Sequence, residues 1–181
     1  PWICDDNYDH SMEMLRTAKA DLCFGHLEIK GIEMQNGVIN EHGLSKSDFK
    51  RFDRVVSGHF HKHTDDGQIF YCGAQYEMTW SDYQDPKAFH IFDTETRELT
   101  RISNPLTIHK KIIYDDKKKD YTNFDIQPYN NHFIKLIVLN KTNNEVFDKF
   151  LERLYNEITV HDLNIVEDYS DIKASVREDI L

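Results

Sequence analysis

The chain has 181 residues, of which 39% are hydrophobic and 30% are charged, and this balance excludes an intrinsically disordered protein. No apolar run approaches the roughly 20 residues that cross a bilayer, so we expect no membrane partner. The formal net charge of -10 argues against a protein that coats nucleic acid with a basic surface. It leaves room for an enzyme that approaches nucleic acid through bound divalent cations.

The three cysteines, Cys4, Cys23 and Cys72, are odd in number and form no C-x-x-C pair, which argues against a thiolate zinc site. Cys23 and Cys72 stand in apolar runs, where small buried thiols are expected. Free thiols favour a reducing compartment, so we expect a cytoplasmic protein.

Hydrophobic patterning in the first hundred residues predicts short strands and short helices. Helices are expected at 9–19 and 45–52, and strands at 21–24, 53–57, 68–72, 88–93 and 98–102. Ser45, followed three residues later by Asp48, is a signature of a helix N-terminus. Several of these strands end in loops that contain glycine, as expected of an α/β or α+β domain.

Composition changes after Asn104 and Pro105, so we expect one domain at 1–105 and a second at 106–181. The second should hold a charged loop at 114–121, strands at 132–139 and 160–166, and a helix between these strands. The helix is expected to start at Thr142, with Glu145 completing a capping box. Five apolar residues at helical spacing predict its buried face: Phe147, Phe150, Leu151, Leu154 and Ile158. This order predicts a small β-α-β unit.

The tetrapeptide Gly58-His59-Phe60-His61, which follows the strand at 53–57, is the most informative in the chain. Glycine lets the chain turn sharply at the strand end, where the two imidazoles can reach metal ions. Neutral imidazole suits Mn, Fe, Zn or Ni. By itself, an H-x-H pattern arises easily by chance in a chain with ten histidines.

A second motif, Gly25-His26, strengthens the metal interpretation because it also follows an apolar strand, at 21–24. Two strands of one sheet that both end in Gly-His place their histidines at one edge. We therefore predict that His26, His59 and His61 form a metal site. Lys62 and His63 lie just beyond it and are expected to contact a DNA phosphate. The other histidines are expected to be surface or incidental positions.

A set made only of histidines is incomplete for two-metal hydrolysis, which needs a bridging carboxylate between ions roughly 3.5–4 Å apart. Glu28, Glu33 and Asp53 are candidates by proximity alone. We expect the missing carboxylates to lie in sequence that this chain does not contain.

The two glycine–histidine motifs resemble the last two metal motifs of calcineurin-like metallophosphoesterases. The stretches 20–29, 55–61 and 73–80 narrow the resemblance to the recombination endonuclease subunits of phages and their SbcD-type bacterial relatives. The resemblance covers about residues 1–105, and residues 107–181 resemble the capping domain of such nucleases. It implies part of a β-sandwich flanked by helices, followed by a β-α-β capping domain.

By position, the resemblance implies that His26 and His59 ligate one metal ion and that His61 ligates a second, with Mn²⁺ as the usual ion. It implies a DNA nuclease subunit, exonuclease or endonuclease, that hydrolyses phosphodiester bonds in DNA recombination and repair. The implied partners are DNA, an SMC-like ATPase and a second copy of the subunit. The implied location is the cytoplasm of an infected bacterial host.

The chain departs from the family in two places. The family's N-terminal motifs D-x-H, G-D and G-N-H-[DE], which supply the bridging Asp, further ligands and the catalytic His, are absent, so this chain alone is expected to be inactive. Ala74 and Gln75 stand where the family often has Asn or Ser and then Pro. Two alternatives stay open: a metallophosphatase of the same fold that acts on another phosphoester, and a non-catalytic interaction fragment.

Overall fold

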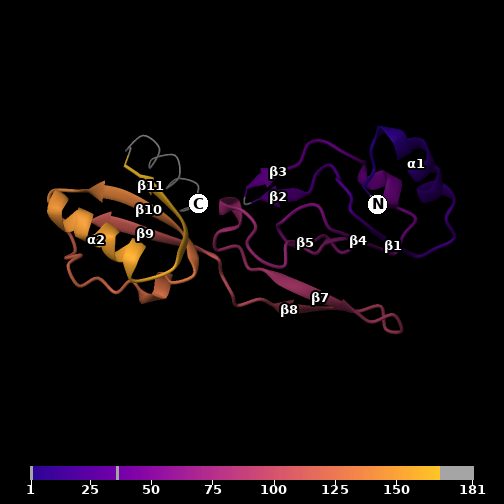
Figure 1. Cartoon of the computed structure of the whole chain (residues 1–181). Helices are drawn as coiled ribbons and strands as arrows, with labels where there is room; N and C mark the ends of the chain where they lie inside the picture. Colours follow the sequence, from indigo (N-terminus) through magenta and orange to yellow (C-terminus); the bar gives the residue numbers. More distant parts are fainter. Residues whose placement is uncertain (1, 36, 168–181) are drawn as a thin grey trace. The chain divides into compact units, whose positions relative to one another are not determined.

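The computed structural model describes residues 2–35 and 37–167, and the chain divides into two compact units, residues 1–106 and 107–181 (Figure 1). Both units combine β-sheets with few helices, so the mixed α/β or α+β composition expected from the sequence is confirmed. Among the described residues, no helix has the length and apolar character needed to span a membrane.

The first unit is built on a four-stranded sheet of order β1-β4-β6-β5. Its strands are β1 (Leu22–Gly25), β4 (Arg54–Ser57), β6 (Ile69–Tyr71) and β5 (Thr64–Asp65). The first three run parallel, and β5 pairs with β6 in the antiparallel sense. Parallel strands are normally covered on both faces, which fits the burial of all of β6 and most of β4.

The other elements of this unit surround the sheet. They are η1 (Asp5–Asn7), α1 (Tyr8–Thr17), η2 (Lys46–Phe49), η3 (Trp80–Asp82), the hairpin of β2 (Glu33–Gln35) and β3 (Val38–Ile39), and the hairpin of β7 (Ala88–Phe92) and β8 (Leu99–Ser103). The helix predicted at 45–52 is a short 3₁₀ helix. Its predicted cap is confirmed, since the Ser45 hydroxyl accepts from the Ser47 N–H and the Ser45 N–H donates to Asp48 at 3.0 Å.

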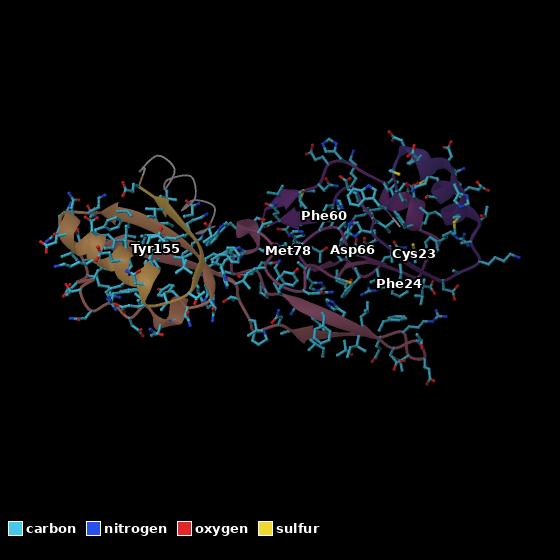
Figure 2. The ribbon with its side chains drawn as sticks, viewed as in Figure 1. Cys23, Phe24, Phe60, Asp66, Met78 and Tyr155 are labelled. Atoms are coloured by element: carbon cyan, nitrogen blue, oxygen red, sulfur yellow. The ribbon has the colours of Figure 1, made fainter. Side chains whose placement is uncertain are left out.

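The apolar core of the first unit includes Ile29, Phe49 and Tyr71, which are fully buried. Cys23 packs against this core, whereas its neighbour Phe24 is 53% exposed and meets the ring of Phe92 (Figure 2). Cys23 and Cys72 are half-buried rather than fully buried, and burial raises the pKa of both thiols. Both cysteines therefore favour the protonated thiol over the reactive thiolate.

The second unit packs one helix on a parallel sheet of order β11-β10-β9. The elements are β9 (His109–Asp115), η4 (Gln127–Tyr129), β10 (His132–Asn140), α2 (Asn144–Asn156) and β11 (Val160–Val166). As predicted, Phe147, Phe150 and Leu154 are buried, and Leu151 and Ile158 pack against the same core. The rings of Tyr114 and Tyr121 complete the cluster.

Two predictions for the second unit were wrong. The charged loop begins after Asp115, because residues 109–115 form β9, whose lysines had masked its strand pattern. The N-cap of α2 is Asn143, whose side chain accepts from the Val146 N–H at 3.2 Å. Thr142 instead donates its backbone N–H to Asp116 at 2.6 Å. The cap therefore lies one residue later than expected, and the predicted capping box of Thr142 and Glu145 is not formed.

Candidate metal centre

The two glycine–histidine motifs meet at one end of the first unit's sheet. β1 and β4 are parallel neighbours, and Gly25 lies opposite Ser57 at their ends. The backbone N–H of Gly58 donates to the carbonyl of Gly25 at 3.1 Å, which joins the two loops beyond the strands. His26 and His59 therefore leave the same edge of the sheet, as the strand pattern predicted.

His26 and His59 form a close pair. The His59 Nδ1 lies 3.4 Å from the His26 Nε2, and the two rings are nearly perpendicular, at 88°. This distance is long for a direct hydrogen bond between nitrogens. Two nitrogens that each lie about 2.1 Å from one ion, at a tetrahedral angle, are roughly 3.4 Å apart. The pair is thus spaced as two ligands of one metal ion would be.

The backbone supports this pair at some conformational cost. His59 has φ of 80°, in a region that residues other than glycine seldom occupy. Gly58, the glycine expected to allow a sharp turn, is not among the positive-φ glycines. Its role is space, because a Cβ at Gly58 would lie 3.1 Å from the His26 ring nitrogen. Backbone strain of this kind is concentrated at functional sites.

The surroundings of His59 favour its neutral imidazole. Burial lowers the pKa of His59, the neighbouring His26 and His61 lower it further, and Glu28 opposes them. Since a metal ion binds the unprotonated nitrogen, a lowered pKa keeps that nitrogen available near neutral pH.

A cavity of about 240 Å³ opens beside the pair. Its lining combines aromatic and carboxylate side chains with the two imidazoles: Trp2, Ile3, Tyr8, His26, Glu28, Gly43, Leu44 and His59. Trp2 packs on both imidazoles, with ring centroids 5.2 Å from His26 and 4.9 Å from His59. Of the carboxylates suggested by proximity, Glu28 alone lines this cavity. Glu33 pairs with Lys62, and Asp53 faces Arg97.

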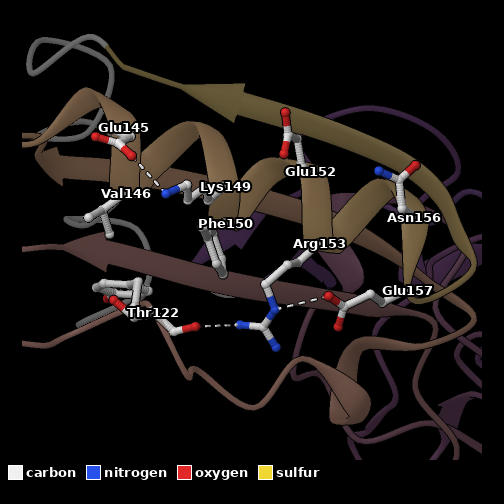
Figure 3. A pocket seen from close by; sticks show the side chains of 10 residues that line it. Thr122, Glu145, Val146, Lys149, Phe150, Glu152, Arg153, Asn156 and Glu157 are labelled. Atoms are coloured by element: carbon white, nitrogen blue, oxygen red, sulfur yellow. Dashed lines mark hydrogen bonds and ion pairs between the residues drawn. The ribbon is translucent and has the colours of Figure 1, made fainter.

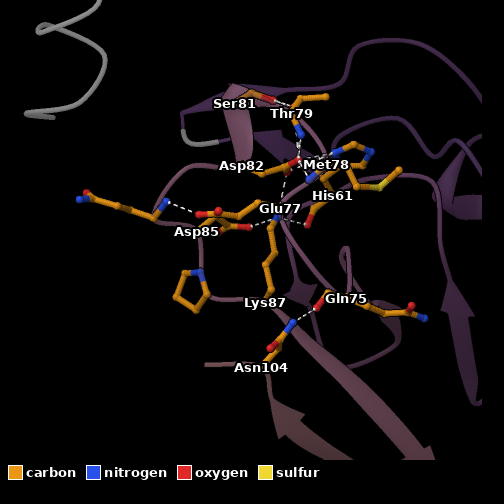
Figure 4. Close-up of polar contacts among 12 residues, drawn as sticks. His61, Gln75, Glu77, Met78, Thr79, Ser81, Asp82, Asp85, Lys87 and Asn104 are labelled. Carbon is orange, nitrogen blue, oxygen red and sulfur yellow. Dashed lines mark hydrogen bonds and ion pairs between the residues drawn. The ribbon is translucent and has the colours of Figure 1, made fainter. Parts of the chain in front are cut away.

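His61 takes a different partner. Its Nδ1 lies 3.1 Å from each carboxylate oxygen of Asp82, a residue that is 2% exposed (Figure 4). Within residues 2–35 and 37–167, no three His, Cys, Asp or Glu side chains are grouped closely enough to hold a metal ion. The structure thus brings two of the three predicted histidines together and directs the third toward a carboxylate.

Asp82 was missed by sequence reasoning. Burial raises the pKa of its carboxyl, but hydrogen bonds from Lys87, Thr79 and Met78 outweigh this effect and bring the pKa to about 2. The available signal was Thr79 followed three residues later by Asp82, the pattern of a capped helical turn, which the structure shows at η3.

Lys62 and His63, the predicted phosphate contacts, both have partners within the chain. The Lys62 ammonium lies 2.7 Å from Glu33. The His63 Nδ1 lies 2.7 Å from the carbonyl of Tyr71, and its ring packs against Phe70 and His90. A phosphate would have to displace the Glu33 contact to bind Lys62. His109, one of the histidines read as surface or incidental positions, is only 5% exposed.

A larger cavity, about 500 Å³, lies along α2 of the second unit (Figure 3). It contains no histidine, and its charges are paired along the helix, Lys149 with Glu145 and Arg153 with Glu157. Arg153 also donates to the carbonyl of Thr122. The lining therefore lacks the imidazoles that mark the candidate site of the first unit.

Comparison with known proteins gives one clear relative. No protein-family model matches the sequence. The chain is 34% identical to "Exonuclease subunit 1" of Enterobacteria phage T4 over 181 residues, which is 99% of this chain. It spans about half of that relative, 49% of its length. The protein is thus similar, across its whole sequence, to part of a phage exonuclease subunit.

Proposed function

We propose that this chain is part of a metal-dependent DNA nuclease subunit of the calcineurin-like metallophosphoesterase type. In this proposal residues 1–105 belong to the nuclease β-sandwich and residues 106–181 form the capping domain. The close pair of His26 and His59 at the sheet edge carries the proposal. The similarity to a T4 protein named as an exonuclease subunit supports the choice of DNA as substrate.

The donor set suits a transition metal. Imidazole nitrogens bind Zn²⁺, Fe²⁺ and Ni²⁺ well, and carboxylate oxygens add affinity for Mn²⁺. Glu28 lines the cavity beside the imidazoles, so a mixed nitrogen and oxygen set is available. We propose Mn²⁺ because the family resemblance favours it, with His26 and His59 at one ion and His61 at a second.

When bound, a pair of divalent ions would activate water and stabilise charge on the phosphodiester oxygens. The residues of this chain would supply position. His26 and His59 would hold their ion at the sheet edge, and the Trp2 ring would shield one side of the imidazoles. Lys62 and His63 would contact a neighbouring phosphate. A bridging carboxylate is still required, so we expect the chain by itself to be inactive.

We further propose that the subunit works with DNA, an SMC-like ATPase and a second copy of itself in recombination and repair, in the cytoplasm of an infected bacterium. These partners rest on the resemblance and on the word "subunit" in the name of the T4 relative.

The test is Mn²⁺-dependent cleavage of DNA, measured beside a phosphomonoester substrate, by the protein in its natural length. We expect cleavage of DNA, loss of most of it in His59→Ala, and no loss in His10→Ala, a histidine exposed on α1. Cleavage by His59→Ala at the wild-type rate would contradict the proposal. Preference for the phosphomonoester would indicate a metallophosphatase, and no response to metal would indicate an interaction module.

A further inference from the structure

The environment of His61 differs from that of the other two histidines. Its ring nitrogen Nδ1 faces both oxygens of Asp82 at 3.1 Å, while the side chain remains 37% exposed. An imidazole that donates Nδ1–H to a carboxylate keeps its lone pair on Nε2. Metal-binding histidines commonly have such a partner, which fixes both the tautomer and the orientation of the ring.

Asp82 is already saturated by donors from the chain. One oxygen accepts from the backbone N–H groups of Met78 and Thr79, both at 2.9 Å, and the other accepts from the Lys87 ammonium at 2.9 Å. With His61 added, few lone pairs remain for a metal ion. Asp82 is therefore poorly suited to be the missing bridging carboxylate, and its geometry fits a residue that orients His61.

Lys87 contacts both the Asp82 carboxylate and the backbone of His61 (Figure 4). Its side chain is 3% exposed, and its ammonium group donates to Asp82, to Asp85 at 2.7 Å and to the backbone carbonyl of His61 at 3.0 Å. All three ammonium protons are thus used. Through Lys87 the His61 backbone and the carboxylate that contacts the His61 ring are tied to one buried group.

A buried ion pair is a costly way to stabilise a loop, since well-packed apolar residues often serve equally well. The buried charges of Asp82 and Lys87 therefore suggest that the pair fixes the local geometry. Here the group that is oriented is His61, because it has the only ring that Asp82 contacts within the described residues.

We propose that Asp82, held by Lys87, is a positioning residue that fixes His61 as the Nδ1–H tautomer with Nε2 directed outward to bind a metal ion. The metal part of this inference rests on the proposed function. The tautomer part rests only on the contacts of Asp82, so the two parts can fail separately.

The first experiment is a ¹⁵N NMR measurement of the His61 tautomer in the metal-free chain at pH 8. We expect Nδ1–H in the wild type. In Asp82→Asn, the amide oxygen should face the two backbone N–H groups, which leaves the amide N–H₂ toward His61 and Lys87. The Lys87 contact is then lost, and a donor opposite His61 Nδ1 should move the ring proton to Nε2. Asp85→Asn is the matched control: it also removes a partner of Lys87 but does not touch His61, and it should keep the Nδ1–H form.

The second experiment follows Mn²⁺ binding by paramagnetic broadening of the His61 ring signals, which detects weak binding. Asp82→Asn should need about 10- to 100-fold more Mn²⁺ for equal broadening, the usual effect of removing such a partner. An Nε2–H tautomer in the wild type would overturn the inference without any variant, even if Asp82→Asn failed to fold. A shifted tautomer with unchanged Mn²⁺ response would overturn the metal role. If Mn²⁺ broadened no histidine of the wild type, the proposed function would fail while the tautomer assignment stood.

Discussion

The two units of this protein use their buried side chains in different ways. The second unit is centred on packed aromatic rings, among them Tyr114, Tyr121 and Phe150, on strands of seven to nine residues. The first unit has strands of two to five residues and buries an ion pair, Asp82 with Lys87, within its loops. Regular packing gives a stable scaffold, whereas a buried ion pair beside His61 points to chemistry. The comparison places the candidate site in the first unit.

Phe150→Ala tests how much aromatic packing contributes to the stability of the second unit. Phe150 is 1% exposed and contacts the rings of Tyr114, Tyr121 and Phe124. Removing it should lower the free energy of unfolding of the second unit by about 4 kcal/mol through lost burial and a cavity. Urea unfolding followed by circular dichroism would measure this. Tyr155→Ala, on the same helix but 60% exposed, should change it by less than about 0.5 kcal/mol.

Lys87→Ala tests how much the buried Asp82–Lys87 ion pair contributes to the stability of the first unit. This change leaves Asp82 buried without its cation, and we expect a loss of about 3 kcal/mol in the stability of the first unit. Both tryptophans, Trp2 and Trp80, lie in that unit, so their fluorescence during urea unfolding reports on it alone.

The control for Lys87 is Lys46→Ala, which removes a more exposed ion pair with Asp66 in the same unit. It should cost at most about 1 kcal/mol. Equal losses for the two lysines would mean that burial of the Asp82–Lys87 pair has no special energetic consequence.

Asp82 should make the stability of the first unit depend on pH. The folded-state pKa of Asp82 is about 2, below its ordinary value of 3.8, so the charged form stabilises the first unit above pH 4. This contribution, on the order of 2 kcal/mol, is lost as the pH falls from about 4 to about 2. When the pH is lowered from 5 to 3, the urea midpoint of the first unit should fall further in the wild type than in Asp82→Asn. An equal fall of the urea midpoint in the wild type and in Asp82→Asn would contradict the lowered pKa of Asp82.

The smallest expected effect concerns the start of α2. Asn143→Ala should destabilise the second unit by about 1 kcal/mol, because it removes the N-cap hydrogen bond to Val146. Thr142→Ala should cost less, since the Thr142 backbone contact to Asp116 survives. A larger loss of stability for Thr142→Ala than for Asn143→Ala would indicate that Thr142 is the N-cap, as the sequence pattern predicted.

Sequence patterns sufficed for features set by local chemistry. The Ser45 cap, the apolar face of α2 and the strands that lead to His26 and His59 were all predicted, because each depends on spacing within one segment. The spacing of Thr79 and Asp82 indicated a capped turn, but it could not show that Asp82 contacts His61. Its contact with His61 joins residues 21 apart through a loop without regular periodicity.

Two misjudged details have similar causes. Residue spacing could not show that His59 would have a φ of 80°, because residues other than glycine seldom occupy this region. β9 was overlooked because its lysines broke the apolar pattern, although Ile112 and Tyr114 are buried. In both cases tertiary contacts overrode the local signal.

If His26 and His59 share one metal ion, calorimetric titration of this chain with Mn²⁺ should give a binding heat. We expect this heat to be lost in His26→Ala and in His59→Ala but kept in His10→Ala. Binding to both single variants with the affinity of the wild type would contradict a shared ion.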